Sequence, residues 1–423
     1  MVSKKFVKKK TLKLKKLGES LIPELAQTAA KKPSQFSENF SPVFLKSGNG
    51  AIVTDLEGNK LLDTIMGIGP IILGYNHPNT NQAIKNQLKK GIIFSLINPL
   101  EVELASKLKK ILPNMDMFRF SKTGADSTSA AIRTARNFTQ KNTIISCGYH
   151  GWHDWNATSL VKNSGIPKFN KSLIKKVQYN NFEELADKIN NDTAAVIMEP
   201  IIFNFPKKNY LEKIRKITKQ KKILLIFDEM WTGFRLDIGG AQKYFNIDAD
   251  LTCYSKAIAN GMPISILAGK KKFLQSLNEK SFFYTTFGGE ALSLAAALSN
   301  IDYLKKKDVC KNIQRNGNFL QKSLSEIIKN NNINFLDIAG YGSRSMLIIN
   351  HEQSLLIKTF LHQEMLKNDI LWNGIINLSY SHKMTHINKI CFSFDKALKR
   401  MNTISVRKLK NEISGNLIKK LVL

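Results

Sequence analysis

Three short apolar runs in this sequence each lead directly into residues that could do chemistry. ILLIF is followed by Asp228 and Glu229, AAVIM by Glu199, and LTCYS by Lys256. Short runs of this composition predict buried strands, and the ligands of a parallel sheet bind at the carboxyl ends of its strands. We therefore expect these side chains to lie near a ligand. For Lys256 taken alone, a strand-terminal lysine that points to solvent is an equally good interpretation.

Asp228 changes that balance. An aspartate at the end of a wholly apolar strand is costly to bury unless it meets a cation. A protonated pyridine nitrogen would be such a cation, and a lysine would hold the same ring as a Schiff base. Asp228 and Lys256 together therefore predict a site for pyridoxal phosphate, a cofactor that acts as an electron sink.

The segment FSKTGADS could bind the phosphate of such a cofactor. It brings Thr123 and Gly124 to the start of a predicted helix over 127–138, where apolar residues recur at helical spacing. Backbone N–H groups and the helix dipole at such a start favour an anion. Because Ser, Thr and Asp are also ordinary N-cap residues, this pattern alone is a weak signal.

The segment GYHGWHDW follows the apolar run TIIS and supplies an aromatic ring. Tyr149 could stack on a pyridine ring. His150 and His153 lie three residues apart and raise metal binding as an alternative, but no third ligand is indicated, so no metal site is predicted. Trp152 and Trp155 are interpreted as packing residues.

The elements that must position these residues alternate along the chain. From about residue 80 to 300, short β-rich runs alternate with helical stretches, which predicts a mainly parallel α/β sheet. Residues 48–64 alternate around a Glu-Gly-Asn turn and predict an antiparallel hairpin. After about residue 305, a long amphipathic segment precedes the apolar runs INFLDIAG, SMLIIN and KICFSF, which predicts an α+β region.

These patterns define the predicted domain organisation. We expect an N-terminal arm and hairpin over 1–80, a large α/β domain that binds the cofactor over 81–305, and an α+β region over 306–423. The first and last of these are predicted to pack together as one small domain built from both chain ends.

Composition sets the class of protein. With 43% hydrophobic residues and no apolar stretch of about 20 residues, the chain is expected to fold without spanning a membrane. The net charge of +31 comes from 64 basic and 33 acidic residues, and only nine of the basic residues are arginine. Arginine is the side chain that reads bases. The excess of lysine is therefore interpreted as compositional bias, and no specific nucleic-acid partner is predicted.

The cysteines and the N-terminus bear on location. The four cysteines are far apart and form no Cys-x-x-Cys pair, which fits a reducing compartment. The basic segment MVSKKFVKKKTLKLKK lacks the apolar stretch of a secretory signal. A cytoplasmic location is therefore expected.

The ordered segments FSKTGADS, GYHGWHDW, AAVIMEP, ILLIFDEMWTGFR, YSKAIANGMP and YTTFGGE together carry more information than any one of them. This set resembles the class III pyridoxal-phosphate aminotransferases, and especially the branch that contains glutamate-1-semialdehyde 2,1-aminomutase. The resemblance covers about residues 17–400. It implies an α/β enzyme of fold type I, pyridoxal 5'-phosphate as cofactor, and a homodimer with shared active sites. The implied substrates are a small-molecule amine donor and a carbonyl acceptor.

Position by position, the resemblance implies roles for individual residues. Lys256 is expected to form the Schiff base, and Asp228 to pair with the pyridinium nitrogen. The other residues implied at the cofactor are Thr123, Gly124 and Ala125 at the phosphate, Tyr149 on the ring, Glu199 and Asn204 nearby, and Thr286 at the phosphate of the neighbouring subunit.

Two departures from the aminomutase pattern bear on the substrate. The aminomutase motif SPVR is SPVF here, so Phe44 replaces an arginine that grips a substrate carboxylate through a bidentate contact. The segment YTTFGGE also differs and, with QTAAKKPSQFS and GYHGWHDW, looks like a related subgroup often linked to amino-sugar or surface-polysaccharide synthesis. Arg235 and Arg344 are alternative contacts for a substrate anion, or structural ion pairs. Lys122 could add charge at the phosphate or point to solvent.

These features favour an aminotransferase that moves an amino group between two molecules. The first alternative is glutamate-1-semialdehyde 2,1-aminomutase itself, which Phe44 opposes. The second is a non-catalytic binding protein on the same fold, which the presence of both Lys256 and Asp228 opposes.

Overall fold

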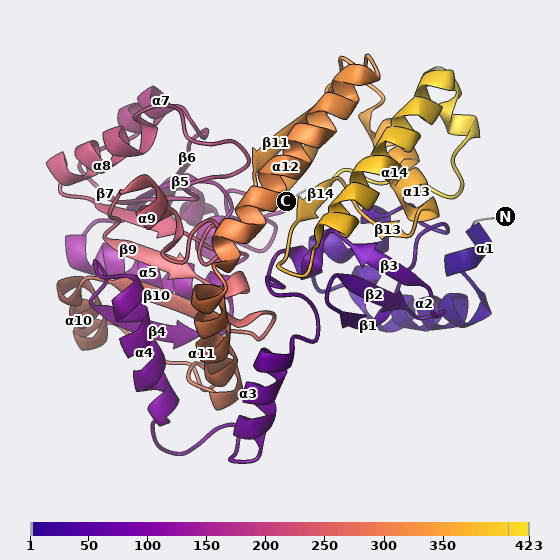
Figure 1. The fold of residues 1–423 in the computed structure, drawn as a ribbon. Helices are drawn as coiled ribbons and strands as arrows, with labels where there is room; N and C mark the ends of the chain where they lie inside the picture. The colour runs from indigo at the N-terminus through magenta and orange to yellow at the C-terminus, as the bar shows by residue number, and fades with distance from the viewer. Residues whose placement is uncertain (1–2, 405, 422–423) are drawn as a thin grey trace. The chain divides into compact units, whose positions relative to one another are not determined.

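The computed structural model describes residues 3–404 and 406–421, which form two compact units (Figure 1). The terminal unit is built from both ends of the chain, up to His77 and from Asn312 onward, and the central unit is Pro78–Lys311. The divisions expected from the sequence were after residues 80 and 305. The terminal unit carries 28 basic and 13 acidic residues, and the central unit carries 36 basic and 20 acidic residues. The excess of positive charge is therefore shared by both units.

The central unit is organised around one seven-stranded sheet in the order β4-β10-β9-β8-β7-β5-β6. Its strands are β4 (Met117–Ser121), β5 (Thr143–Cys147), β6 (Ile174–Lys176), β7 (Thr193–Met198), β8 (Leu224–Asp228), β9 (Leu251–Tyr254) and β10 (Ser265–Gly269). Strands β6, β5, β7, β8 and β9 are parallel, and β10 is antiparallel to both of its neighbours. The mainly parallel sheet predicted from the sequence is confirmed.

Helices cover both faces of this sheet, which explains why its strands are apolar on both sides. The helices of the central unit are α3 (Pro78–Leu88), α4 (Pro99–Ile111), α5 (Gly124–Thr139), α6 (Asp154–Ala157), α7 (Phe182–Asp187), α8 (Tyr210–Gln220), α9 (Gly240–Phe245), α10 (Lys271–Lys280) and α11 (Ala291–Lys306). On β8, Ile226 packs in a cluster with residues of α5 and α10, whereas Leu225 and Phe227 pack with residues of α8. Every residue of β7, β8 and β9 is buried.

The terminal unit contains two smaller sheets, in the orders β1-β2-β3-β13 and β11-β12-β14. Their strands are β1 (Leu45–Asn49), β2 (Ile52–Asp55), β3 (Lys60–Asp63), β11 (Leu336–Tyr341), β12 (Arg344–Ile349), β13 (Ile370–Leu371) and β14 (Ile375–Asn377). Strands β2 and β3 pair antiparallel, so the predicted hairpin is confirmed. Because β13 pairs with β3, strands from both ends of the chain share one sheet.

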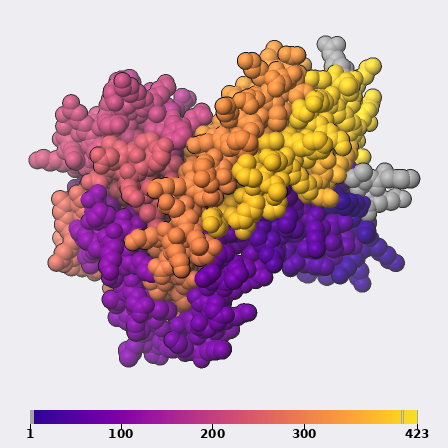
Figure 2. Space-filling model, in the orientation of Figure 1, coloured from indigo at the N-terminus to yellow at the C-terminus, as the bar shows by residue number. Residues whose placement is uncertain are grey.

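Figure 2 shows the yellow C-terminal part of the chain against the indigo N-terminal part, and backbone hydrogen bonds join segments near the two termini within the terminal unit. The backbone N–H of Asn416 donates to the Glu38 carbonyl at 3.1 Å, and that of Lys419 donates to the Ser34 carbonyl at 2.8 Å. The N-terminal helices are α1 (Ser3–Phe6) and α2 (Lys9–Leu21). Among the residues that the structure describes, no helix is both long and apolar enough to cross a membrane.

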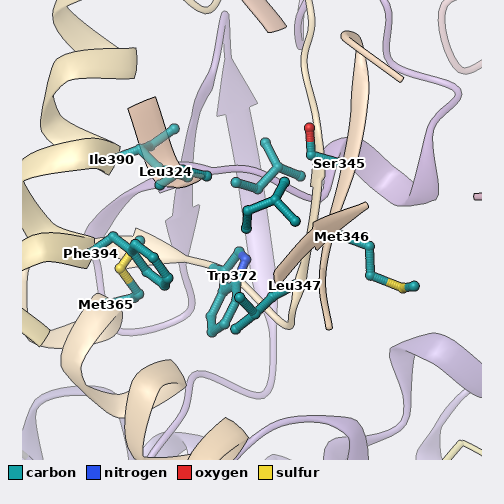
Figure 3. Close-up of a pocket in the computed structure, with 10 residues that line it drawn as sticks. Leu324, Ser345, Met346, Leu347, Met365, Trp372, Ile390 and Phe394 are labelled. Carbon is teal, nitrogen blue, oxygen red and sulfur yellow. The ribbon is translucent and has the colours of Figure 1, made fainter. Parts of the chain in front are cut away.

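Helices α12 (Val309–Asn330), α13 (Ser354–Lys367) and α14 (Met384–Thr403) build the core of the terminal unit with both of its sheets. Figure 3 shows part of this core, where Trp372 lies among Leu347, Met365 and Phe394. The void between these side chains is about 10 Å³, which is at the lower limit for one water molecule. This part of the core is therefore close-packed and offers no room for a ligand.

The run KICFSF is part of helix α14, so placing it among the strand-like runs of the predicted α+β region was wrong. Ile387, Ile390 and Phe394 are buried and recur every three or four residues, as on one face of a helix. Phe392 is 67% exposed on the opposite face. A short apolar run has no period of its own, and the residues around it determine whether it becomes a strand or a helix.

His362 of α13 predicts a pH dependence of stability. It is fully buried between the Ser41 hydroxyl, 2.6 Å from Nε2, and the Trp372 carbonyl at Nδ1. Burial lowers its pKa to about 4. The histidine therefore contributes stability above its unfolded pKa of about 6.5, and this is lost as the pH falls toward 4, by on the order of 3 kcal/mol. Urea unfolding at pH 7.0, 5.5 and 4.5 should show a smaller decline for His362→Gln than for the wild type, and equal declines would contradict the prediction.

Candidate functional site

The strand register brings three of the predicted residues to one edge of the central sheet. Met198 pairs with Phe227, so Glu199 and Asp228 stand at the same level of neighbouring strands. Asp228 pairs with Cys253, and Lys256 follows two residues after the end of β9. These are the carboxyl ends of β7, β8 and β9, where a parallel sheet binds its ligands.

Asp228 is a buried carboxylate held by two donors. It is 2% exposed, its Oδ2 lies 2.7 Å from His150 Nδ1, and its Oδ1 accepts from the Met230 N–H at 3.1 Å. An ionised carboxylate only accepts hydrogen bonds, so His150 donates from Nδ1. Within the described ranges, no Lys or Arg nitrogen forms an ion pair with this carboxylate within 4 Å. Asp228 is therefore oriented, and its charge suits a cationic ligand.

His150 is the main residue whose role the sequence did not reveal. It is 2% exposed, and its ring stacks on Trp155 with centroids 6.1 Å apart. Its contact is with Asp228, whereas His153 Nδ1 lies 2.7 Å from the Ser129 hydroxyl. The two histidines thus serve different partners. In the part of the chain that the structure describes, no group of three or more His, Cys, Asp or Glu side chains is placed to hold a metal.

Thr123 caps the N-terminus of α5. The Thr123 N–H donates to Asp126 Oδ2 at 2.7 Å and its hydroxyl accepts from the Asp126 N–H at 3.3 Å, which forms a capping box. The Thr123 carbonyl also accepts from the Ser265 hydroxyl at 2.6 Å, which ties this turn to β10. The first N–H groups of a helix have no partner within it. This end of a 16-residue helix therefore suits an anion.

Gly124 and Ala125 follow this cap. A Cβ atom at Gly124 would lie 2.8 Å from Met230 Sδ, closer than real Cβ contacts allow. The start of the helix thus lies against the flexible side chain of Met230, which would have to shift to admit a larger residue at this position. Ala125 is 6% exposed, and a Cβ atom placed on Gly151 would lie 2.7 Å from the Cβ atom of Ala125. The turn after β5 and the start of α5 therefore pack against each other without intervening side chains.

Tyr149 presents its ring to the same edge. Its N–H donates to Glu199 Oε1 at 3.0 Å, and Glu199 is 7% exposed. Gly148 precedes it with φ of +118°, and a Cβ there would lie 2.7 Å from Glu199 Oε1. The Tyr149 side chain is 43% exposed, and burial together with the nearby charge of Asp228 raises its pKa. Glu199 therefore positions Tyr149, whose ring is open to a ligand.

Lys256 begins the short 3-10 helix η6 (Lys256–Ala259) with φ of +48°. Such a left-handed conformation is rare outside glycine and is often found at functional sites. Its Nζ lies 3.5 Å from the centroid of the Trp231 ring. Trp231 is a second residue that the sequence reasoning missed, because only its place in DEMWTGFR could have drawn attention to it.

Two of the predicted site residues, Asn204 and Thr286, take no part in the contacts described at the sheet edge. Asn204 is exposed in the loop between β7 and α8. Thr286 is exposed in the loop between α10 and α11, where it lines an open cavity of about 540 Å³ with Glu101 and residues 93–98. One chain thus assembles Thr123, Gly124, Ala125, Tyr149, Glu199, Asp228 and Lys256 around one sheet edge, and places Asn204 and Thr286 on exposed loops.

Other candidates have structural partners. Lys122 Nζ donates to Glu290 Oε1 at 2.7 Å and to the Pro263 carbonyl at 3.0 Å, so it neither points to solvent nor serves the helix start. Arg235 and Arg344 are 1% and 6% exposed. Trp155 packs in the core, but Trp152 is 69% exposed, so its interpretation as a packing residue was wrong.

Glu229, next to Asp228, anchors the turn after β8. It is fully buried and accepts from the N–H groups of Ala241 (2.6 Å) and Gln242 (3.1 Å) and from the Thr232 hydroxyl (2.7 Å). Burial raises its pKa to about 7. Its contacts join β8 to the start of α9, which makes Glu229 a support for the end of the strand that carries Asp228.

Comparison with known proteins agrees with this geometry. Residues 34–368 match the family model described as aminotransferase class III. A glutamate-1-semialdehyde 2,1-aminomutase of Methanosarcina acetivorans is 37% identical over 314 residues, which cover 70% of this chain and 74% of that protein. A 3-aminobutyryl-CoA aminotransferase of Cloacimonas acidaminovorans is 34% identical over 313 residues, which cover 72% and 75%.

Solved structures share the fold. FumI of Sphingopyxis sp. MTA144, in its PLP internal aldimine form, aligns with a TM-score of 0.87 at 23% identity over 93% of this chain and 96% of that one. A glutamate-1-semialdehyde aminomutase of Pseudomonas aeruginosa PAO1, in complex with PMP, aligns with a TM-score of 0.82 at 18% identity over 92% and 94%. The predicted fold class, an α/β fold of type I, is confirmed.

Proposed function

We propose that this chain, which belongs to the class III aminotransferase family, moves an amino group from a small-molecule amine donor to a separate aldehyde or ketone acceptor. Membership makes it an enzyme of the aminotransferase and aminomutase class with pyridoxal 5'-phosphate as cofactor. The observation that carries the proposal is that Asp228 and Lys256 lie at the carboxyl ends of the neighbouring strands β8 and β9. Synthesis of amino sugars or surface polysaccharides is the proposed setting, supported by the YTTFGGE pattern.

The residues at the sheet edge fit this cofactor. The buried Asp228 carboxylate, with His150 as its ionisable partner, suits a protonated ring nitrogen. The capped start of α5 at Thr123 and Gly124 suits the phosphate, and the open ring of Tyr149 suits the pyridine face. When bound, the cofactor supplies an electron sink that stabilises a carbanion.

The protein's own residues would then carry out the proton chemistry. Lys256 would hold the cofactor through Nζ and, when released from it, would act as a free base in the half-buried site. In its neutral form, Nζ would remove a proton from the amine-bearing carbon of the donor. In the second half of the reaction, it would deliver a proton to the carbonyl carbon of the acceptor. Asp228 keeps a proton on the ring nitrogen, and His150 and Met230 keep Asp228 in place.

The alternative function is that of the aminomutase relatives, and a direct assay separates the two. Phe44, in place of the motif's arginine, supports transfer between two molecules. We expect purified protein to form no 5-aminolevulinate from glutamate-1-semialdehyde, and to change its cofactor absorbance with an amine donor and then a carbonyl acceptor from a screen. Phe44→Arg is the matched variant, because it restores the missing carboxylate anchor. Rapid formation of 5-aminolevulinate by the wild type would overturn the proposal in favour of the aminomutase.

A homodimer with shared active sites is part of the proposal. In the described part of the central unit, most of the large apolar residues that are at least 44% exposed lie on two segments, whereas Trp152, Val161, Phe169 and Tyr244 lie elsewhere. The first segment carries Leu88, Ile92, Ile93, Phe94, Leu96, Ile97 and Val102, and the second carries Phe282, Tyr284 and Phe287. Several of them line the cavity beside Thr286. Exposed apolar surface of this kind marks an interaction site, which supports a second subunit there. A cytoplasmic location is also proposed, supported by the four free cysteines.

Mixed dimers test whether Thr286 serves the other subunit. Thr286→Ala alone should weaken cofactor binding about tenfold, because one hydrogen bond to a charged phosphate is lost. In a dimer of one Lys256→Ala chain and one Thr286→Ala chain, one site regains both Lys256 and a threonine from across the interface. Titration with cofactor should therefore show one site of wild-type affinity per mixed dimer. Weakened binding at that site would mean that Thr286 acts within its own subunit, and wild-type affinity of the Thr286→Ala protein alone would mean that Thr286 has no role at the cofactor.

A further inference from the structure

The indole of Trp231 lies against the amine that the proposed function makes reactive. The distance from Lys256 Nζ to the centroid of the Trp231 ring is 3.5 Å. Both side chains are half-buried. The sequence gives Trp231 no role, and neither the phosphate cradle of α5 nor the contacts of Asp228 use it.

The backbone on both sides of Trp231 is anchored in the turn after β8 by contacts that do not involve the lysine. On one side of Trp231, the Met230 N–H donates to Asp228 Oδ1 at 3.1 Å. On the other side, Thr232 is 1% exposed and donates to Glu229 Oε2 at 2.7 Å. The Gly233 N–H closes the turn onto the Glu229 carbonyl at 2.9 Å, and a Cβ on Gly233 would lie 2.4 Å from the Tyr254 ring. The backbone of Trp231 is therefore held between anchored neighbours.

The backbone of Lys256 is fixed independently. The side-chain amide of the buried Asn300 on α11 donates to the carbonyls of Ala257 and Ile258, both at 2.8 Å. Ala257, Ile258 and Ala259 are buried as well. The flexible part of Lys256 is thus its four-carbon side chain, whose end lies over the face of the Trp231 indole.

An aromatic face attracts a cation through its negative π surface, and tryptophan does so most strongly. We propose that Trp231 is a positioning residue that holds Lys256 Nζ over its indole and stabilises the ammonium form of that amine. The inference rests on the proposed function, because it assumes that Lys256 binds the cofactor. Nζ attacks the aldehyde carbon of the cofactor only after losing a proton; its lone pair forms the N–C bond and the aldehyde oxygen leaves as water. Trp231 therefore sets the pH at which the lysine can bind the cofactor.

The other titratable groups at this sheet edge are held by contacts that do not involve Trp231, so we expect them to stay in place when it is replaced. They are Asp228 and Glu229 at the end of β8, Glu199 after β7, and Tyr149 and His150 after β5. A change in the pH dependence of a Trp231 variant would therefore report the loss of the indole.

The experiment follows the rate at which cofactor-free protein gains visible absorbance when pyridoxal 5'-phosphate is added, as a function of pH. For Trp231→Leu, we expect the midpoint of the pH profile to fall by about half a pH unit, the size of an exposed to half-buried cation–π contact. Trp231→Phe keeps an aromatic face and should lie between Trp231→Leu and the wild type. Trp152→Leu, which removes a 69% exposed tryptophan, should keep the wild-type midpoint.

Thermal melting of each variant shows whether it is folded, and Trp231→Met replaces Trp231→Leu if the latter is not. A midpoint in Trp231→Leu equal to that of the wild type would overturn the role of Trp231 and leave the proposed function intact. A wild-type protein that gains no visible absorbance at any pH would overturn the proposed function, and this inference with it.

Discussion

Lys256→Ala is expected to abolish the visible absorbance that forms on adding pyridoxal 5'-phosphate and to reduce transamination by at least about 1,000-fold. The covalent link to the cofactor and the proton transfer at the substrate carbon both depend on Nζ, and a positioned base alone contributes about 10²- to 10⁴-fold. Lys256 also lies just after the end of β9, the strand whose Cys253 pairs with Asp228. Alanine removes both functions while the buried residues that follow, Ala257–Ala259, are unchanged.

The control is Lys271→Ala, which removes one exposed lysine at the start of α10 in the same unit. Its absorbance and turnover should match the wild type, because this exposed lysine, one of 55 in the chain, has no role in the proposed chemistry. If Lys256→Ala kept the visible band, a different lysine would bind the cofactor. If the wild type itself formed no band, the assignment of the sheet edge as a cofactor site would fail.

Asp228→Asn is the second variant expected to have a large effect. A buried carboxylate balances the charge of a protonated ring nitrogen, and the isosteric amide cannot. Neutralising one partner of a buried ion pair costs about 3–5 kcal/mol, which corresponds to a loss of roughly 150- to 5,000-fold in kcat/KM. The amide oxygen of asparagine can still accept from the Met230 N–H, and its NH2 group can donate to Nδ1 of His150 once that ring carries its proton on Nε2, so the fold around the site should be preserved.

Two further variants provide a smaller expected loss and a control with which the loss in Asp228→Asn can be compared. His150→Ala leaves the charge on Asp228 but removes the donor to its Oδ2, and we expect a loss of about tenfold, the size of a hydrogen bond to a charged group. Asp302→Asn neutralises a carboxylate that is 66% exposed on α11 and should have no effect on kcat/KM. Steady-state kinetics with a donor and acceptor from the screen measures all three. An Asp228→Asn enzyme within about threefold of the wild type would rule out the proposed role of the charge.

The sequence was most informative where local pattern and burial agree. ILLIF, AAVIM and LTCYS could be recognised as strands because a parallel sheet covered on both faces needs unbroken apolar runs. Polar residues directly after such runs must stand at the sheet edge, which is why Asp228, Glu199 and Lys256 could be selected from the order of residues alone. The same reasoning does not apply to KICFSF, which is also a short apolar run but lies within a helix. Its helical character shows only in the spacing of more distant buried residues such as Ile387 and Met401.

The sequence by itself thus determined the fold class, the edge of the sheet where the candidate site lies, and the two residues proposed to carry the chemistry. The tertiary structure decided what holds them. His150 reaches Asp228 across 78 positions of sequence, and Trp231 reaches Lys256 from the end of a neighbouring strand. Such partners leave no periodic signal, because a side-chain contact depends on where two strands are paired in space and not on the residues beside either one. The same reason turned Lys122 from a candidate phosphate ligand into the ion-pair partner of Glu290.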